Sequence, residues 1–284
     1  MKPIFAALVV LATVLLPLTD ASGQTLIVKV SNTLLGLNQK WAAAYQAGHP
    51  AVTLQVTGEG TTAVLAALAD KQADLVLVPR AMRYKEAQAC MSALGRRPAE
   101  AKVAVSGVAV YVNTTNPVQV VSYDELAAIF GGQSQNWKEL DGGRDQPISV
   151  YAPATNSVQG ELFNEEVLNG RGFPAGVHLL AGPELLQTVA ADPAAIGLGA
   201  LTAAPGVQTL SIKRAPSSTP VKPTEDNIAR RIYPLSRYVF SYSNPAANPE
   251  AVKAYLDWIR SDDGQQIARE AGFYPLPAIL RSSP

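Results

Sequence analysis

The chain has 284 residues, of which 48% are hydrophobic and 16% charged, so it can bury the core of one large domain or two medium ones. Lysine plus arginine equals aspartate plus glutamate at 23 each, and the pI is near 6.7. This balance excludes an overall field that would attract nucleic acid or an anionic membrane, so any ligand must be held by local groups.

The N-terminus has the pattern of a secretory signal. Lys2 precedes an apolar run from 4 to 16, which a proline ends, and the small residues Ala21-Ser22-Gly23 follow. The run is shorter than the roughly 20 residues that span a bilayer. We therefore expect residues 1–23 to be cleaved and the remaining chain to be exported, soluble and either periplasmic or secreted.

The first element after the signal is a continuous apolar strand, Thr25 to Val30. It ends at Ser31-Asn32-Thr33, and a helix follows whose apolar face includes Trp41 and Tyr45. The three polar residues can cap this helix, bind a ligand, or do both.

A second strand, turn and helix come next, in residues 54–68. Gly58 and Gly60 are expected to give the turn backbone conformations that are closed to other residues, and Thr61 and Thr62 to cap the helix. Unpaired N–H groups and the helix dipole favour an anion at such a start. An ordinary strand-to-helix turn has the same pattern, because Gly-x-Gly alone is a weak motif.

Arg80 follows a third buried strand, LVLVP, at the strand end where α/β proteins commonly bind ligands. The single cysteine, Cys90, lies in a probable helix and is expected to be a buried, inert thiol. His49 and His178 are isolated, so no metal-ligand cluster or Cys/His pair is expected, and no cofactor.

The strand, turn and helix pattern recurs in the second half. Residues 102–113 form a long apolar strand interrupted at Ser106-Gly107, and residues 147–151 form another, followed by the polar turn 152–159 and a helix. The acidic pairs Glu165-Glu166 and Asp262-Asp263 are expected to be solvated helix positions or caps. The chain lacks Gly-x-Ser-x-Gly and a histidine near a nucleophile, which argues against a hydrolase.

Several short strings occur in an order that resembles one family, the phosphate-binding-protein branch of the type 2 periplasmic solute-binding proteins, which are receptors of ABC importers. The strings are Ser31-Asn32-Thr33, Gly58-Glu59-Gly60-Thr61, Ala73-Asp74 before Arg80, Val105-Ser106-Gly107-Val108-Ala109-Val110, Ile129-Phe130-Gly131-Gly132, Asn136-Trp137-Lys138-Glu139-Leu140, Pro223-Thr224-Glu225-Asp226-Asn227-Ile228, Tyr233-Pro234-Leu235-Ser236-Arg237 and Gly264-Gln265 leading to Ala271-Gly272-Phe273. Each string is weak, but their order covers nearly the whole exported chain.

This resemblance implies an α/β fold of two lobes, each a sheet flanked by helices, with a ligand cleft between them. It pairs a lobe of residues 24–105 plus 238–284 with a lobe of residues 106–237. It implies a monomeric, non-enzymatic receptor that captures phosphate or a related small anion and hands it to importer membrane subunits. The implied ligand-binding residues lie on four loops: Ser31, Asn32, Thr33, Gly60, Thr61, Arg80, Asn156, Ser157, Val158 and Gln159.

Two loops depart from the family pattern. Pro153 stands where the family's fourth loop has arginine, and Val158-Gln159 replaces Gly-Thr. Pro79-Arg80-Ala81 replaces Ser-Arg-Pro or Ser-Asp in the third loop, so Arg80 is the residue that could supply the missing positive charge. The alternative to a transport receptor is a sensory or protein-docking module with a degenerate anion site.

Overall fold

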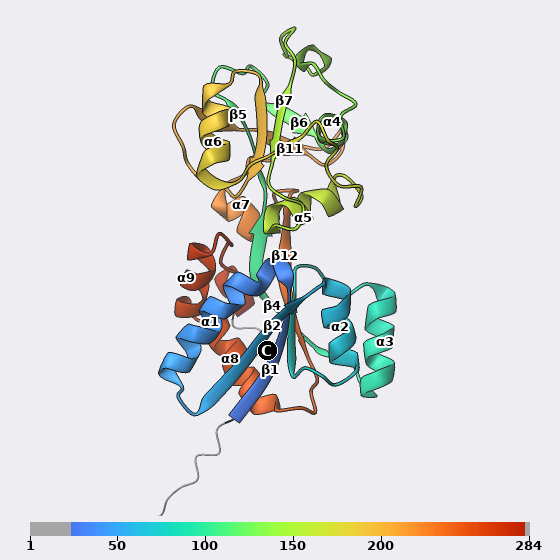
Figure 1. The fold of residues 1–284 in the computed structure, drawn as a ribbon, viewed down its shortest axis with the longest axis vertical. Coiled ribbons are helices and arrows are strands. Elements are labelled where there is room, and N and C mark those ends of the chain that lie inside the picture. Colours follow the sequence, from blue (N-terminus) through green and yellow to red (C-terminus); the bar gives the residue numbers. More distant parts are fainter. Residues whose placement is uncertain (1–23, 282–284) are drawn as a thin grey trace, which may run out of the picture.

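The computed structural model describes residues 24–281, so the expected signal segment lies outside the described residues. The fold has two lobes, each built around one mixed sheet, and Figure 1 shows the lobes at opposite ends of the long axis. No helix among residues 24–281 is long and apolar enough to cross a bilayer. The α/β, two-lobed architecture expected from the sequence is confirmed.

The first lobe contains a five-stranded sheet of order β2-β1-β3-β12-β4. Strands β1, β2 and β3 are parallel, whereas β12 runs antiparallel between β3 and β4. The bounds are β1 Gln24–Ser31, β2 Val52–Glu59, β3 Leu75–Val78, β4 Ala99–Gly107 and β12 Ser236–Ser243.

Helices cover both faces of this sheet. One face packs on α1, α8 and α9 around Trp41, whose indole Nε1 donates to the carbonyl of Gly264 at 2.7 Å. The other face packs on α2 and α3, and Cys90 of α3 is buried there as predicted. Burial raises the pKa of the Cys90 thiol, which keeps it protonated and unreactive. The bounds are α1 Leu35–Gly48, α2 Thr61–Ala69, α3 Tyr84–Leu94, α8 Pro249–Arg260 and α9 Asp262–Glu270.

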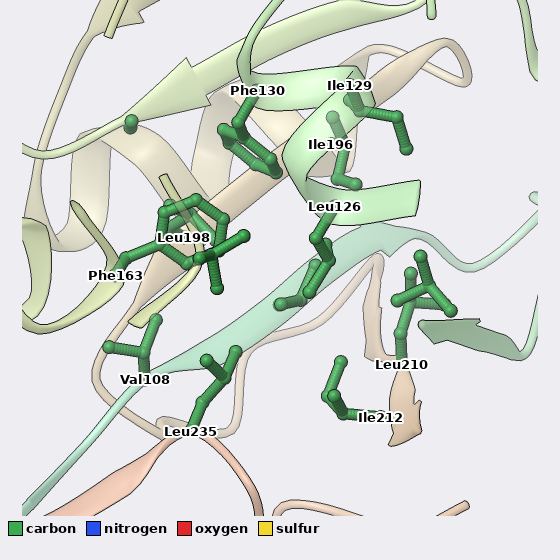
Figure 2. Packing of buried hydrophobic residues seen from close by; sticks show 14 of the residues in the cluster. Val108, Leu126, Ile129, Phe130, Phe163, Ile196, Leu198, Leu210, Ile212 and Leu235 are labelled. Carbon is green, nitrogen blue, oxygen red and sulfur yellow. The ribbon is translucent and has the colours of Figure 1, made fainter. Parts of the chain in front are cut away.

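The second lobe contains a sheet of order β10-β5-β9-β7-β8 and a two-stranded sheet, β11-β6. Its main core is an apolar cluster in which Phe130, Phe163, Ile196 and Leu198 are fully buried (Figure 2), and a smaller cluster lies between β5, β9 and α6. The strands are β5 Ala109–Asn113, β6 Val120–Ser122, β7 Ser149–Ala152, β8 His178–Leu179, β9 Ala195–Gly199, β10 Val207–Thr209 and β11 Ser211–Lys213. The helices are α4 Tyr123–Phe130, α5 Val158–Glu166, α6 Gly182–Ala191 and α7 Glu225–Ala229, with the 3-10 turns η1 Asn32–Leu34 in the first lobe and η2 Trp137–Glu139 in the second.

Three segments connect the lobes. Strand β4 leads into β5 through Val108, β12 returns beside it with Ser106 opposite Arg237, and the C-terminal segment crosses at Tyr274. Tyr274 exchanges two backbone hydrogen bonds with Val105, at 2.8 and 2.9 Å, and packs with the core of the second lobe. The helix α10 Ala278–Arg281 follows. The residue boundaries expected for the lobes stay a prediction.

The glycine turn of the first lobe differs from expectation. Gly58 and Gly60 both have ordinary negative φ angles or extended backbone, so neither is needed for an unusual conformation. Gly58 lies in close contact with the first loop, because a Cβ there would lie 2.9 Å from Asn32 Oδ1 and 3.0 Å from a Leu35 methyl, both of which are ends of side chains. The residue that caps α2 is Gly60, and neither Thr61 nor Thr62 caps the helix. The capping prediction for the threonines was therefore wrong, and the Thr61 hydroxyl is free for other contacts.

Candidate functional site

The first two predicted loops meet at the carboxyl ends of β1 and β2. These strands are parallel neighbours, with Ser31 opposite Glu59, so their ends lie at one edge of the sheet. Ser31 Oγ and Thr61 Oγ1 are 2.9 Å apart and hydrogen-bonded. Because Thr61 is the first residue of α2, its hydroxyl lies beside the unpaired N–H groups of that helix. Two of the predicted ligand-binding residues, Ser31 and Thr61, are therefore in direct contact.

Asn32 and Thr33 lie in η1, which begins at the end of β1. Asn32 is exposed and approaches Gly58 of the second loop. Thr33 is half-buried, and its Oγ1 is shielded from solvent without a hydrogen-bond partner. Ser31 precedes η1 as its N-cap but makes no side-chain capping bond, so its hydroxyl is committed only to Thr61.

The fourth loop comes from the second lobe and meets the first loop. Ser157 caps α5, accepting from Gly160 N at 3.0 Å and donating to the carbonyl of Ala154 at 2.7 Å. Helix α5 contacts η1 and β4, and Val158 packs against the core of the first lobe. The start of α5 therefore lies where the lobes meet (Figure 1). Asn156 is exposed and Gln159 half-buried in the same turn.

Arg80, the residue of the third loop, is already paired. Its guanidinium donates to both carboxylate oxygens of Glu86 at 2.8 Å, and also to the carbonyl of Ala81 at 3.0 Å. The hydrogen bond from Arg80 lowers the pKa of Glu86, and the same bond raises the pKa of Arg80. Glu86 also accepts from the Arg83 N–H at the start of α3. The positive charge expected at this loop is thus matched by a carboxylate of its own lobe.

Glu59, the acidic residue in the glycine turn, is matched in the same way. Lys29 of β1 donates to Glu59 Oε1 at 2.8 Å across the two parallel strands. The side chains are 20% and 38% exposed, so this pair is partly screened and contributes little stability. Its main effect on the site is to neutralise a carboxylate close to Gly60.

The sequence reading missed an arginine at the crossing between the lobes. Arg237 of β12 is 5% exposed, and its guanidinium is paired with Glu165 and lies 3.8 Å from Glu161, both on α5. Glu165 was expected to be a solvated position and is instead half-buried in this pair, while its neighbour Glu166 is exposed as predicted. Arg237 occurred in the string Tyr233 to Arg237, but nothing in that string indicated that it faces a helix 72 residues away.

Unpaired polar atoms gather on the segments that meet here. Among the described residues, those with a buried side-chain N or O atom and no hydrogen-bond partner include Thr33 (Oγ1), Glu161 (Oε2) and Arg237 (Nε and Nη2). These residues lie on η1, α5 and β12, which come from the first lobe, the second lobe and the crossing. Buried polar groups are nearly always hydrogen-bonded in folded proteins. A cluster of unpaired ones marks a place suited to a polar ligand.

The family of the chain follows from comparison with known proteins. A model of the PBP superfamily domain matches residues 18–263. The phosphate-binding protein PstS of Pseudomonas aeruginosa is 30% identical over 268 residues, covering 87% of this chain and 82% of the relative. Protein SphX of Synechococcus elongatus is 29% identical over 94% of this chain and 82% of its own length.

Solved structures show the same fold. A possible phosphate-binding protein from Planctomyces limnophilus superposes with a TM-score of 0.79 at 25% identity, over 91% of this chain and 95% of that one. An ABC-type phosphate transport receptor from Vibrio cholerae superposes with a TM-score of 0.72 at 24% identity, over 89% of this chain and all of that one. With the two lobes and the convergent loops, these matches show that the chain belongs to the PBP superfamily, in the branch of the phosphate-binding proteins.

Proposed function

We propose that this protein is a non-enzymatic solute-binding protein that captures phosphate or a related small anion between its lobes for an ABC importer. The relative that is 30% identical over 87% of the chain is named a phosphate-binding protein, and one structural neighbour is described as a phosphate transport receptor. These comparisons favour the receptor over the sensory or docking module considered from the sequence.

The observation that carries the proposal is the meeting of hydroxyl-bearing loops from both lobes. The Ser31 to Thr61 hydrogen bond joins two loops of the first lobe, and the start of α5 contacts η1 from the second. An anion at this place receives donors from hydroxyls and from two helix N-termini, whose dipoles add positive potential. We propose that its contacts come from these ten residues: Ser31, Asn32, Thr33, Gly60, Thr61, Arg80, Asn156, Ser157, Val158 and Gln159.

The proposal includes lobe closure around the ligand. The lobes, residues 24–105 with 238–284 and residues 106–237, are joined by narrow crossings, which is the arrangement that allows hinge closure. We further propose that residues 1–23 are removed on export to the periplasm or the medium and that the protein acts as a monomer. N-terminal sequencing of the exported protein and light scattering test these two points.

Calorimetry tests the proposed function directly. The purified protein is titrated with phosphate, sulfate and small carboxylates at constant ionic strength. We expect one saturable site for phosphate per chain. If none of these anions binds, the proposal is refuted. Equal binding to all of them would leave the anion site but show that it does not select phosphate.

A further inference from the structure

Arg237 is a buried cation whose hydrogen bonds are only partly made. It is held at the crossing between the lobes, on β12 opposite Ser106 of β4. One nitrogen, Nη1, donates to Glu165 Oε2, whereas Nη2 stops 3.8 Å from Glu161 Oε2, beyond hydrogen-bond distance. Both Nε and Nη2 are buried without a hydrogen-bond acceptor, although Nη2 is ion-paired with Glu161. Burying charged donors without acceptors is costly, so Nε and Nη2 are positions where an added anionic oxygen would be stabilised.

The two carboxylates that approach Arg237 stand one helical turn apart. Glu161 and Glu165 occupy positions i and i+4 of α5, which lie on the same face of a helix. Their charges also act on Arg80, whose pKa is raised first by the hydrogen bond with Glu86 and then by the charges of Glu86, Glu165 and Glu161. Three carboxylates, those of Glu86, Glu161 and Glu165, therefore interact with only two guanidinium groups, those of Arg80 and Arg237.

A bound anion must compete with these carboxylates for the two guanidinium groups. Arg80 has both terminal nitrogens bonded to Glu86, in a bidentate pair within its own lobe. Arg237 donates one hydrogen bond to a carboxylate, its Nε and Nη2 have no hydrogen-bond acceptor, and its partner Glu165 lies on α5. Of these two arginines, Arg237 is the one that can donate to a further anionic oxygen without breaking a bidentate ion pair.

We propose that Arg237 is an additional cationic contact for the captured anion and that Glu165 competes with the anion for this guanidinium, so that the Glu165 to Arg237 pair sets anion affinity. The proposal rests on the proposed function and names a positive contact that the ten predicted ligand residues do not include. The anion takes the free Nε and Nη2 donors, and the bond from Nη1 to Glu165 weakens as the positive charge is shared. The Glu165 carboxylate thereby competes with the ligand for Arg237.

Replacing Glu165 with glutamine tests the competition. Glu165→Gln keeps the shape of the side chain and one acceptor oxygen but removes the negative charge. We expect phosphate to bind about tenfold more tightly to Glu165→Gln, the size of effect seen when one charged partner is removed. Glu166→Gln is the matched control, because it makes the same change in net charge one residue away, at an exposed position of α5. Its phosphate affinity should stay within about twofold of wild type.

Arg237→Gln and the double variant decide whether Glu165 acts through Arg237. Arg237→Gln should lose at least about tenfold in phosphate affinity, and Glu165→Gln should then have no further effect. Thermal melting without phosphate, compared with melting at saturating phosphate, separates lost binding from lost folding, because a folded variant that binds phosphate is stabilised by it.

Each outcome decides the proposal. Tighter binding by Glu165→Gln that depends on Arg237 supports it, as does binding by Glu165→Gln alone when the wild type binds nothing. If the wild type binds phosphate and Glu165→Gln binds it equally or more weakly, the competition is wrong while the proposed function stands. If neither protein binds any anion tested, both the competition and the proposed function are wrong.

Discussion

One added methyl group at Gly160 should displace the fourth loop of the proposed anion site. A Cβ on Gly160 would lie 2.1 Å from the carbonyl oxygen of Ala154 and 3.0 Å from Ser157 Oγ. The first of these atoms belongs to the backbone of the fourth loop and cannot rotate away. Gly160→Ala must therefore push the start of α5 away from the turn that Ser157 caps.

The expected cost follows from this overlap. Forcing a methyl group into a filled space typically costs about 1–3 kcal/mol of unfolding free energy. Gly36 in the first turn of α1 is the matched control, because a Cβ there meets no atom within 4 Å. Gly36→Ala should instead stabilise the protein by about 0.5–1 kcal/mol, since alanine favours the helix.

Urea unfolding and phosphate calorimetry on both variants measure the two effects. We expect Gly160→Ala to unfold at lower urea and to bind phosphate more weakly, and Gly36→Ala to change stability in the opposite direction with little effect on binding. If Gly160→Ala is as stable as wild type and binds phosphate equally well, the packing of the fourth loop described here is wrong.

Three further predictions concern single contacts. Thr61→Val should weaken phosphate binding by about tenfold in calorimetry, because one hydrogen bond to the anion is lost. Thr62→Val, at the exposed neighbouring position, should leave the affinity unchanged. Equal effects of the two changes would contradict a role for the Thr61 hydroxyl. Arg80 lowers the pKa of Glu86 from its ordinary value of 4.5. In urea unfolding, the difference in stability between wild type and Arg80→Gln should therefore be complete above about pH 4.5 and shrink as the pH falls below it. A difference that does not depend on pH would contradict this. Phe163→Ala should cost about 3–5 kcal/mol in the same assay, because Phe163 is fully buried against Phe130 at a ring-centroid distance of 4.8 Å, and a loss under 1 kcal/mol would show that the core collapses around the gap.

The sequence was most informative where local pattern determines position. The pattern predicted two apolar strands, each followed by a hydroxyl-bearing turn, and the structure brings Ser31 and Thr61 of these turns together because the strands are parallel neighbours. The buried state of Cys90 was also predictable from its helix. Gly58 was predicted to matter for its backbone conformation, whereas in the structure it lies in a strand and approaches the side chains of Asn32 and Leu35 closely.

Contacts between distant segments could not be predicted. Glu165 and Glu166 are adjacent and chemically identical, and only the position of β12 relative to α5 makes one a buried partner and the other a solvated group. The pairing of Arg80 with Glu86 is closer in sequence, but it depends on the loop after β3 folding back onto the start of α3. In both cases the charge of a side chain was visible, while its partner was set by tertiary structure.

The position of β12 in the first sheet has a consequence for how the chain folds. This strand lies between β3 and β4, although it comes 129 residues after the end of β4, counting from Gly107 to Ser236. A polypeptide synthesised or exported from its N-terminus therefore has β1 to β4 available long before the strand that joins β3 to β4. Until about the last sixth of the chain is available, β3 and β4 lack the strand between them, and the first sheet cannot complete its hydrogen-bonded ladder.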